Sequence, residues 1–400
     1  MGGKAVALTV INILVTVVLG LLLLPVLFLL LEILSAMRRS GLREITDFAG
    51  NAPAVAVLVP AHDEEKVLGQ ALKAISPQLA LSDRLVVIAD NCTDSTPILA
   101  RKFGAEVVER NDLTRIGKGY ALDAGARYLE AKPPDVVVVI DADCVPAEGA
   151  VSRLSRAAFA IGGPVQGAYL MTAPAGSRRE TQLREAMILL KNLVRPLGLY
   201  HLGFPCLLTG SGMAFPWAIF RDAPLASANR VDDLQLAVDL AIAGSPAEFC
   251  PAVHVTNVLP AEPSASRLQR SGWMQGHLRT LVKQVPHLLR AALKAKRFAL
   301  AVLALELSVP PLSMLILLWL IACALALAVS WAGATVWPLV PVVLGTAALL
   351  ASGSLFWTRF VHDRVPAKAL LAIPLMFRHT ISAAFAAAFT KPKPWVRTSR

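Results

Sequence analysis

Two aspartates placed two residues apart, Asp141 and Asp143, are the residues of this chain best suited to chemistry. They follow the run V-V-V-V-I at 136–140, whose continuous apolar character predicts a strand buried on both faces. In an extended chain, residues i and i+2 point to the same side, so both carboxylates can face one ion. Hard oxygen ligands suit Mg²⁺ or Mn²⁺, which take few protein ligands and share phosphate oxygens. Aspartates also occur in turns at strand ends, but the buried strand favours a metal-binding role.

Polar side chains also follow two earlier apolar runs, at 55–59 and 85–89. The first run is followed by P-A-H-D-E-E from Pro60 and the second by D-N-C-T-D-S-T from Asp90. Carboxylates here would repel a pyrophosphate, so they better suit hydrogen-bond donors on a base or ribose. Structural alternatives remain, because Glu64 suits a first helical turn and Asp94 can cap the next helix. Asp90 is therefore the better nucleoside-binding candidate.

A lysine lies between two glycines in Gly117-Lys118-Gly119. The segment is not a Walker A loop, because the first glycine is missing and no Ser or Thr follows the lysine. A lysine between glycines at a helix start can still approach a nucleotide closely, although a surface turn would have the same pattern.

The elements that must position these residues alternate along the middle of the chain. Apolar runs of strand length are separated by segments with helical periodicity near 64–77, 94–103, 118–130 and 148–160. This alternation predicts a doubly wound, mostly parallel α/β sheet. Such sheets bind ligands at the carboxyl ends of their strands, which is where the polar residues stand.

Long apolar segments flank this polar middle. Apolar residues make up 55% of the chain, and residues 5–36 carry no charge until Glu32. With further segments at about 309–331 and 337–360, three membrane spans are expected, the first an uncleaved anchor. Arg38, Arg39 and Arg43 follow the first span, and the 332–336 connection is uncharged. The positive-inside rule therefore places residues 37–300 and the C-terminus in the cytoplasm.

The positive charges behind the net charge of +11 are distributed in a way that favours lipid over nucleic acid as the binding partner. No acidic residue lies between Glu262 and Glu306, whereas eight basic residues do, with leucines and valines recurring at helical spacing. A basic amphipathic helix before a span is typical of a segment lying on an anionic leaflet, and a solvated charged helix is the alternative. The five cysteines show no close pairing or metal-ligand spacing, so we assign them no chemistry.

Seven motifs occur in one order and together resemble the family-2 glycosyltransferases with the GT-A fold. They lie within about residues 50–300 and read V-P-A-H-D-E-E, A-D-N-C-T-D-S-T, G-K-G-Y-A-L, V-I-D-A-D, L-T-G-S-G-M-A-F, V-D-D-L-Q-L and Q-R-S-G-W. The resemblance implies a metal-dependent enzyme that uses a nucleotide sugar, most simply a UDP-sugar.

The resemblance also implies roles for individual residues. Asp141 and Asp143 match the D-x-D that holds Mg²⁺ or Mn²⁺ against the donor diphosphate, and Asp233 matches the catalytic base. The base stands in Asp232-Asp233, where the family has Glu-Asp, and an N-terminal helix cap is the alternative for Asp233. Two sets complete the implied site: nucleotide-sugar-binding Pro60, Glu64, Asp90, Lys118 and Asp141, and acceptor-binding Thr209, Gly210, Ser211, Gly212, Gln269 and Trp273.

One motif departs from the family's pattern. Polymerising members carry Q-x-x-R-W, whereas this chain has Gly272 at the arginine position. Arg270 lies two residues earlier, which on a helix is a different face. Gln269 and Trp273 are four residues apart and still share one face.

These observations predict a membrane-bound, inverting glycosyltransferase that adds a sugar to a lipid-linked acceptor in exopolysaccharide or cell-envelope glycan biosynthesis. A processive polysaccharide synthase is the nearest alternative, and a membrane sugar nucleotidyltransferase is one from a different class. We expect a multi-pass protein of the cell inner membrane with a cytoplasmic catalytic domain, bound to membrane lipids and not to nucleic acid. The expected parts are an anchor at 1–36, a catalytic domain at 50–263, a Q-x-x-x-W segment and basic interfacial helix at 264–300, two spans within 301–362, and an interfacial helix and basic tail at 363–400.

Overall fold

The computed structural model describes residues 2–38, 52–227, 232–259, 280–332 and 336–389. Within them, a mixed eight-stranded sheet carries the order β3-β2-β1-β4-β7-β6-β8-β5. The strands are β1 (Val55–Ala61), β2 (Arg84–Asp90), β3 (Glu106–Arg110), β4 (Val136–Val139), β5 (Val145–Pro146), β6 (Val165–Thr172), β7 (Met213–Pro216) and β8 (Glu248–Val258).

The first four strands of this order form the parallel half of the sheet. β3, β2, β1 and β4 are all parallel, with Leu58 opposite both Val86 and Val139. Beyond β4 the direction changes, because β7 is antiparallel to β4 and to β6, while β6 and β8 are parallel. The carboxyl ends of β1, β2 and β4 therefore meet at one edge, where the polar motifs were expected to lie.

Helices cover both faces of the sheet, as expected for a doubly wound domain. Alternate residues of β1 point to opposite sides, so Leu58 packs with α4 (Lys118–Leu129) and Val57 packs with α2 (Leu68–Ile75) and α5 (Ala150–Ile161). Helices α3 (Thr96–Lys102), α8 (Trp217–Asp222) and α9 (Asp232–Ala243) complete the layers. The predicted α/β class is confirmed.

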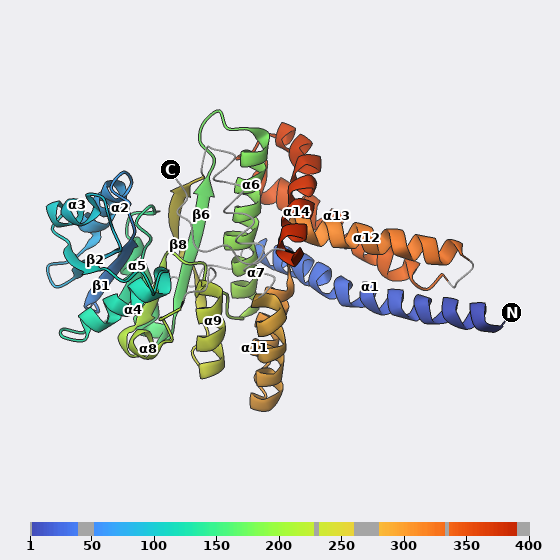
Figure 1. Cartoon of the computed structure of the whole chain (residues 1–400), viewed down its shortest axis with the longest axis horizontal. Coiled ribbons are helices and arrows are strands. Elements are labelled where there is room, and N and C mark those ends of the chain that lie inside the picture. Colours follow the sequence, from blue (N-terminus) through green and yellow to red (C-terminus); the bar gives the residue numbers. More distant parts are fainter. Residues whose placement is uncertain (1, 39–51, 228–231, 260–279, 333–335, 390–400) are drawn as a thin grey trace.

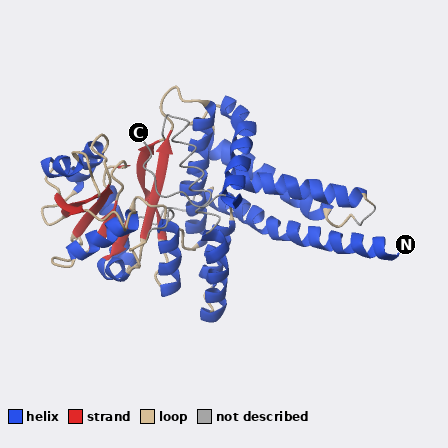
Figure 2. Ribbon diagram, viewed as in Figure 1, coloured by secondary structure: helices blue, strands red, loops and turns tan. Residues whose placement is uncertain are grey.

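Three long apolar helices project together from one end of this domain (Figures 1 and 2). They are α1 (Gly2–Ala36), α12 (Leu312–Trp331) and α13 (Leu339–Phe356), the last continuing as a π-helical turn at Trp357–Val361. All three are long and apolar enough to cross a membrane. Their positions match the three spans predicted from sequence.

A layer of helices lies between the sheet and these three helices. It contains α6 (Arg179–Leu189), the π-helical turn η2 (Leu190–Val194), α7 (Arg195–Leu202) and α11 (Phe298–Ser308), with α14 (Ile373–Phe389) after a short turn at Ala367–Ala372. In Figure 1, α6, α9, α11 and α14 run across the axis of α1 and α12. A further helix covers residues 280–295.

One buried cation joins three of these elements. The Arg195 guanidinium bonds to Glu32 Oε2 of α1 at 2.8 Å and to Glu306 Oε2 of α11 at 2.5 Å. Gly198 allows the close crossing of α7 and α1, since a Cβ there would lie 2.2 Å from the Glu32 carbonyl oxygen. Glu306, the first acidic residue after Glu262 in the sequence, is thus buried against Arg195.

Candidate active site

The D-x-D aspartates stand directly beyond β4, the central parallel strand. The Ile140 N–H donates to the Leu58 carbonyl, and the Asp141 N–H donates to Ser211 Oγ at 3.1 Å. Carboxylate oxygens of Asp141 and Asp143 and the thiol of Cys144 lie within 4.8 Å of one another. Burial raises the pKa of Cys144 well above its ordinary value, and a soft thiol suits Mg²⁺ or Mn²⁺ less well than carboxylate oxygens do. The two carboxylates are therefore the candidate metal ligands.

Lys118 begins α4 and reaches across to the D-x-D. Its ammonium donates to Asp141 Oδ1 and to the Gly210 carbonyl. The flanking glycines make this placement possible. Gly117 has a φ of 142°, and a Cβ on Gly119 would lie 2.4 Å from the Leu225 carbonyl oxygen. Burial alone would lower the pKa of Lys118, but Asp141 and nearby carboxylates reverse this and raise it.

The Thr209–Gly212 loop lies next to Lys118 and is held from behind by Gln166 of β6. Gln166 accepts from the Thr209 N–H at 2.8 Å and donates to the Ser211 carbonyl at 2.9 Å. Gly210 has a φ of 96°, and a Cβ there would lie 3.4 Å from Asp233 Oδ2. The glycine therefore lets the loop, Lys118 and Asp233 approach one another closely.

Asp232 and Asp233 form the first turn of α9, on the far side of Lys118. Asp233 Oδ1 accepts from the Leu234 N–H at 2.9 Å, so one oxygen serves the helix end while Oδ2 faces Gly210. Burial raises the pKa of Asp233, an effect that Lys191 and Lys118 oppose. Burial and then repulsion by Asp233 raise the pKa of Asp232 to about 6.

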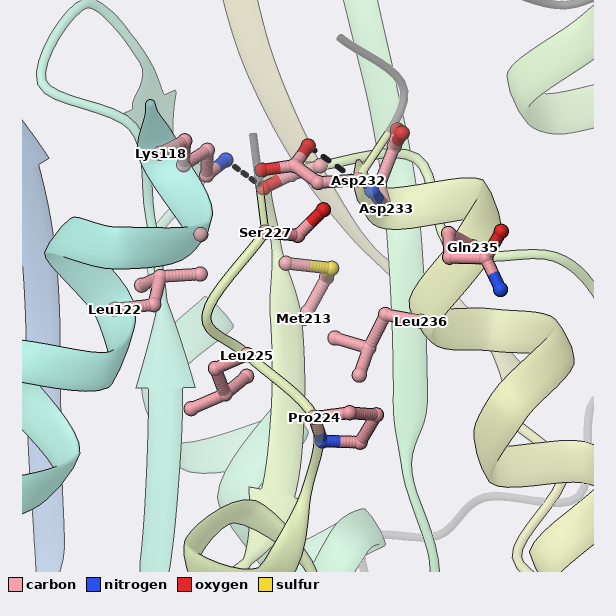
Figure 3. Close-up of a pocket in the computed structure, with 12 residues that line it drawn as sticks. Lys118, Leu122, Met213, Pro224, Leu225, Ser227, Asp232, Asp233, Gln235 and Leu236 are labelled. Carbon is pink, nitrogen blue, oxygen red and sulfur yellow. Dashed lines mark hydrogen bonds between the residues drawn. The ribbon is translucent and has the colours of Figure 1, made fainter. Parts of the chain in front are cut away.

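A pocket lies beneath these polar groups (Figure 3). Lys118, Ser227, Asp232, Asp233 and Gln235 supply its polar side chains, and the other lining side chains are apolar. The apolar residues are Leu122, Met213, Pro224, Leu225 and Leu236. Polar groups that converge over an apolar floor are typical of ligand sites.

The charges at this site suit a divalent cation. Asp141, Asp143, Asp232 and Asp233 contribute four carboxylates, and Lys118 is the cation bonded among them. Burial raises the pKa of Asp141, Lys118 opposes this, and Asp143 raises it further. An additional positive charge on the paired aspartates would relieve their repulsion, and their hard oxygens match Mg²⁺ or Mn²⁺.

The strand ends of β1 and β2 lie side by side, as predicted. Asp90 is buried and accepts from Arg110 at 2.5 Å, and its carbonyl bonds to His62 Nδ1 at 2.7 Å. The Glu64 N–H pairs with Thr96 Oγ1 at 2.8 Å, and Pro60 is in register with Ile88 of β2. The nucleoside-binding roles of Pro60, Glu64 and Asp90 remain predictions.

A structural role is visible for Asp94. Its Oδ1 accepts from the Thr96 N–H at 2.9 Å, at the first residue of α3. Asp94 thus bonds to the end of the helix that it was expected to cap, although Ser95 holds the N-cap position.

Two predicted acceptor residues, Gln269 and Trp273, lie outside the described residues. Two other residues were missed by sequence reasoning, Gln166 behind the Thr209–Gly212 loop and Lys191 of η2, whose ammonium interacts electrostatically with Asp233. Each interrupts a mainly apolar run, V-Q-G-A-Y-L for Gln166 and I-L-L-K-N-L-V for Lys191. A polar residue that interrupts such a run is the signal that could have identified them.

Curated relatives match short stretches of the chain. Glucosyl-3-phosphoglycerate synthase of Mycolicibacterium paratuberculosis is 39% identical over 97 residues, which are 23% of this chain and 29% of the relative. The 4,4'-diaponeurosporenoate glycosyltransferase of Staphylococcus haemolyticus is 37% identical over 93 residues, 22% of this chain and 24% of the relative. The matches thus span less than a third of either relative's length.

Similarity over the whole chain comes from a solved structure, and similarity over its middle comes from a family model. A mannosyltransferase from Pyrobaculum calidifontis, solved in complex with GDP-Man and Mn²⁺, aligns with a TM-score of 0.56 at 19% identity. The alignment covers 96% of this chain and 99% of that one, so the two share a fold. The family model described as "Glycosyltransferase like family 2" matches residues 53–276, more than half of the chain. The chain therefore belongs to glycosyltransferase family 2.

Proposed function

We propose that this protein is an inverting glycosyltransferase that moves one sugar from a nucleoside-diphosphate sugar to a lipid-linked acceptor at the cytoplasmic membrane face. The observation that carries the proposal is the bridge made by Lys118. Its ammonium bonds to Asp141 of the D-x-D and to Gly210 of the acceptor loop. Donor-side and acceptor-side groups therefore meet around one cation.

The donor side suits a diphosphate leaving group. Asp141 and Asp143 would hold Mg²⁺ or Mn²⁺, which supplies charge neutralisation for the diphosphate when bound. Lys118 is a second positive charge at the same place, and its three N–H donors suit phosphate oxygens. A sugar held here develops positive charge at the anomeric carbon as its bond to the diphosphate lengthens.

The acceptor side offers a proton acceptor on the other side of Lys118. Asp233 Oδ2 is free of the helix-end bond that Oδ1 makes, and it faces the loop at Gly210. A carboxylate so placed would accept the proton of an attacking hydroxyl. Attack from the side opposite the diphosphate inverts the anomeric carbon.

The membrane helices support a lipid-linked acceptor and single additions. Three candidate spans anchor the chain in a bilayer, where a lipid-linked acceptor would be held. Three spans can hardly enclose a polymer channel, and Gly272 removes the arginine fork of the polymerising pattern. We therefore place the enzyme in exopolysaccharide or envelope-glycan assembly as a single-sugar transferase.

The test is a donor screen with the purified full chain in lipid, read as released nucleoside diphosphate and as lipid-extractable labelled product. Asp233→Asn should lower transfer by about 10²–10⁴-fold or more while donor binding largely persists. Asp143→Ala should abolish metal-dependent turnover. Asp222→Asn is the matched control, because Asp222 is an exposed acid that pairs with its neighbour Arg221.

Three outcomes would contradict parts of the proposal. Near-normal transfer by Asp233→Asn would show that another residue is the catalytic base. A ladder of many additions on one acceptor would indicate a processive synthase instead of single transfer. Release of pyrophosphate from a sugar phosphate and a nucleoside triphosphate would indicate a nucleotidyltransferase.

A further inference from the structure

The helix over residues 280–295 exposes an apolar stripe to its surroundings. Val282, Leu289 and Leu293 are 70%, 44% and 81% exposed. At about 100° per residue they fall within roughly 40° of one another around the helix axis. Large apolar side chains gathered on one exposed face indicate an interaction surface.

A basic stripe runs beside the apolar stripe. Lys283, Arg290 and Lys294 are all exposed and fall within about 40° of one another, roughly a quarter-turn around the helix from the apolar side chains. Lys296 and Arg297 follow, and no acidic residue occurs between Glu262 and Glu306. The face is therefore positively charged along its whole length.

The opposite face of this helix packs on α9. Leu288 and Ala292 are buried in one apolar cluster with Leu234 and Val238 of α9. Gln284 Nε2 donates to Gln235 Oε1 at 2.6 Å. At the far end, Arg297 donates to the carbonyl of the last α9 turn, at Ala241. The helix is thus attached along the element whose first turn carries Asp232 and Asp233.

We propose that this face docks on the anionic headgroups of the bilayer, with the apolar stripe inserted among them. Basic side chains are attracted to a negative leaflet, and their alkyl stems lie along the apolar boundary. The chain continues into α11 and then into the candidate span α12 at Leu312, so the same bilayer is within reach. Charge complementarity and this continuity favour lipid over a second copy of the chain, whose matching face would also be positive.

Docking would have a consequence for the reaction. Because the helix over residues 280–295 packs on α9, its contact with lipid would set the distance between Asp233 and the membrane surface. This consequence rests on the proposed function, whereas docking itself does not. The two are therefore tested by separate readouts.

Docking is tested with an environment-sensitive fluorophore on Leu293→Cys, using the full chain reconstituted in vesicles whose lipids carry a quencher. The expected result is strong quenching in phosphatidylcholine mixed with phosphatidylglycerol and weak quenching in phosphatidylcholine alone. The same probe on Leu81→Cys, a fully exposed site of the catalytic domain, should be quenched in neither. The unsubstituted chain, labelled in the same way, gives the background from its own cysteines.

Charge variants test whether attraction to anionic lipid holds the helix on the bilayer. Lys283→Gln, Arg290→Gln and Lys294→Gln combined should lower the ratio of docked to undocked helix by about 100-fold, roughly fivefold for each cation. Lys73→Gln, Lys102→Gln and Lys132→Gln combined remove the same charge from exposed positions elsewhere and should leave the ratio unchanged.

Two results would overturn the proposal. One is quenching at residue 293 no greater than at residue 81. The other is a signal that follows the protein-to-lipid ratio and ignores lipid charge, which would indicate a second copy on this face. Sugar transfer is measured in the same vesicles. If docking positions Asp233, the transfer rate should depend on phosphatidylglycerol, and this dependence should be lost when Lys283, Arg290 and Lys294 are all changed to glutamine. Docking without that dependence would refute the coupling alone.

Discussion

Replacing Arg195 by methionine should destabilise the protein strongly, because the arginine is the cation between two buried carboxylates. Its guanidinium makes bonds of 2.8 Å to Glu32 Oε2, 2.5 Å to Glu306 Oε2 and 2.9 Å to the Glu306 carbonyl. The side chains of Glu32 and Glu306 are only 0% and 6% exposed, so water cannot replace the lost partner. Removing one member of a buried ion pair costs about 3–5 kcal/mol.

The assay is thermal unfolding of the full chain in nanodiscs. A cost of that size corresponds to a fall in Tm of about 4–6 °C for a chain of 400 residues, at roughly 1.2 °C for each kcal/mol. Arg101→Met is the matched control, since Arg101 and Glu109 form an ion pair whose side chains are 52% and 48% exposed. An exposed pair contributes at most about 1 kcal/mol.

A rescue variant tests whether the cost comes from unpaired charge. Changing Glu32 and Glu306 to glutamine together with Arg195→Met should recover most of the lost Tm, because all three buried charges of this cluster are then removed. A fall in Tm no larger for Arg195→Met than for Arg101→Met would refute a stabilising role of this cation between α1 and α11.

Two further predictions concern the site. Because burial and the neighbouring carboxylate raise the pKa of Asp232 to about 6, transfer should fall as pH drops through about 6, when the acidic pair takes up a proton and the base is lost. Asp232→Asn should move that limb of the pH–rate profile to lower pH, and a limb near the ordinary carboxyl pKa of about 4 in the parent would contradict the reasoning. Gly212→Ala should lower Tm more than Gly176→Ala does. Both glycines have positive φ, but a Cβ on Gly212 would lie 2.8 Å from Val255 Cγ2, whereas a Cβ on Gly176 would meet no atom within 4 Å. Equal falls in Tm would show that backbone strain alone determines the loss of stability.

The strands and the D-x-D could be predicted because their signals are local. Four valines and an isoleucine before Asp141 indicate a buried strand whatever surrounds it, and β4 lies where that run stands. The three candidate membrane helices are also local features, set by length and apolar content. The strand order beyond β4 was harder to predict from the sequence. The reversal of direction at β7 depends on pairing between distant segments and not on the pattern within one strand.

Contacts between distant residues explain what the sequence could not supply. Arg195 is 163 residues from Glu32 and 111 from Glu306, and no local pattern links the three. Gln166 lies 45 residues before the Ser211 carbonyl that it supports. Glu32 and Glu306 each interrupt an apolar segment of the sequence, which indicates a need for a partner but does not name one.

Lys118 shows how much of the site depends on the third dimension. Its sequence setting, between two glycines at a helix start, was equally compatible with a surface turn. The fold brings Asp141 from 23 residues and Gly210 from 92 residues away to the same ammonium. Since Gly210 carries no side chain, Asp233 Oδ2 also approaches this point. Residue type alone therefore suggested an anion-binding lysine, but only the crossing of β4, α4 and α9 makes it the cation shared by the candidate metal ligands and the candidate base.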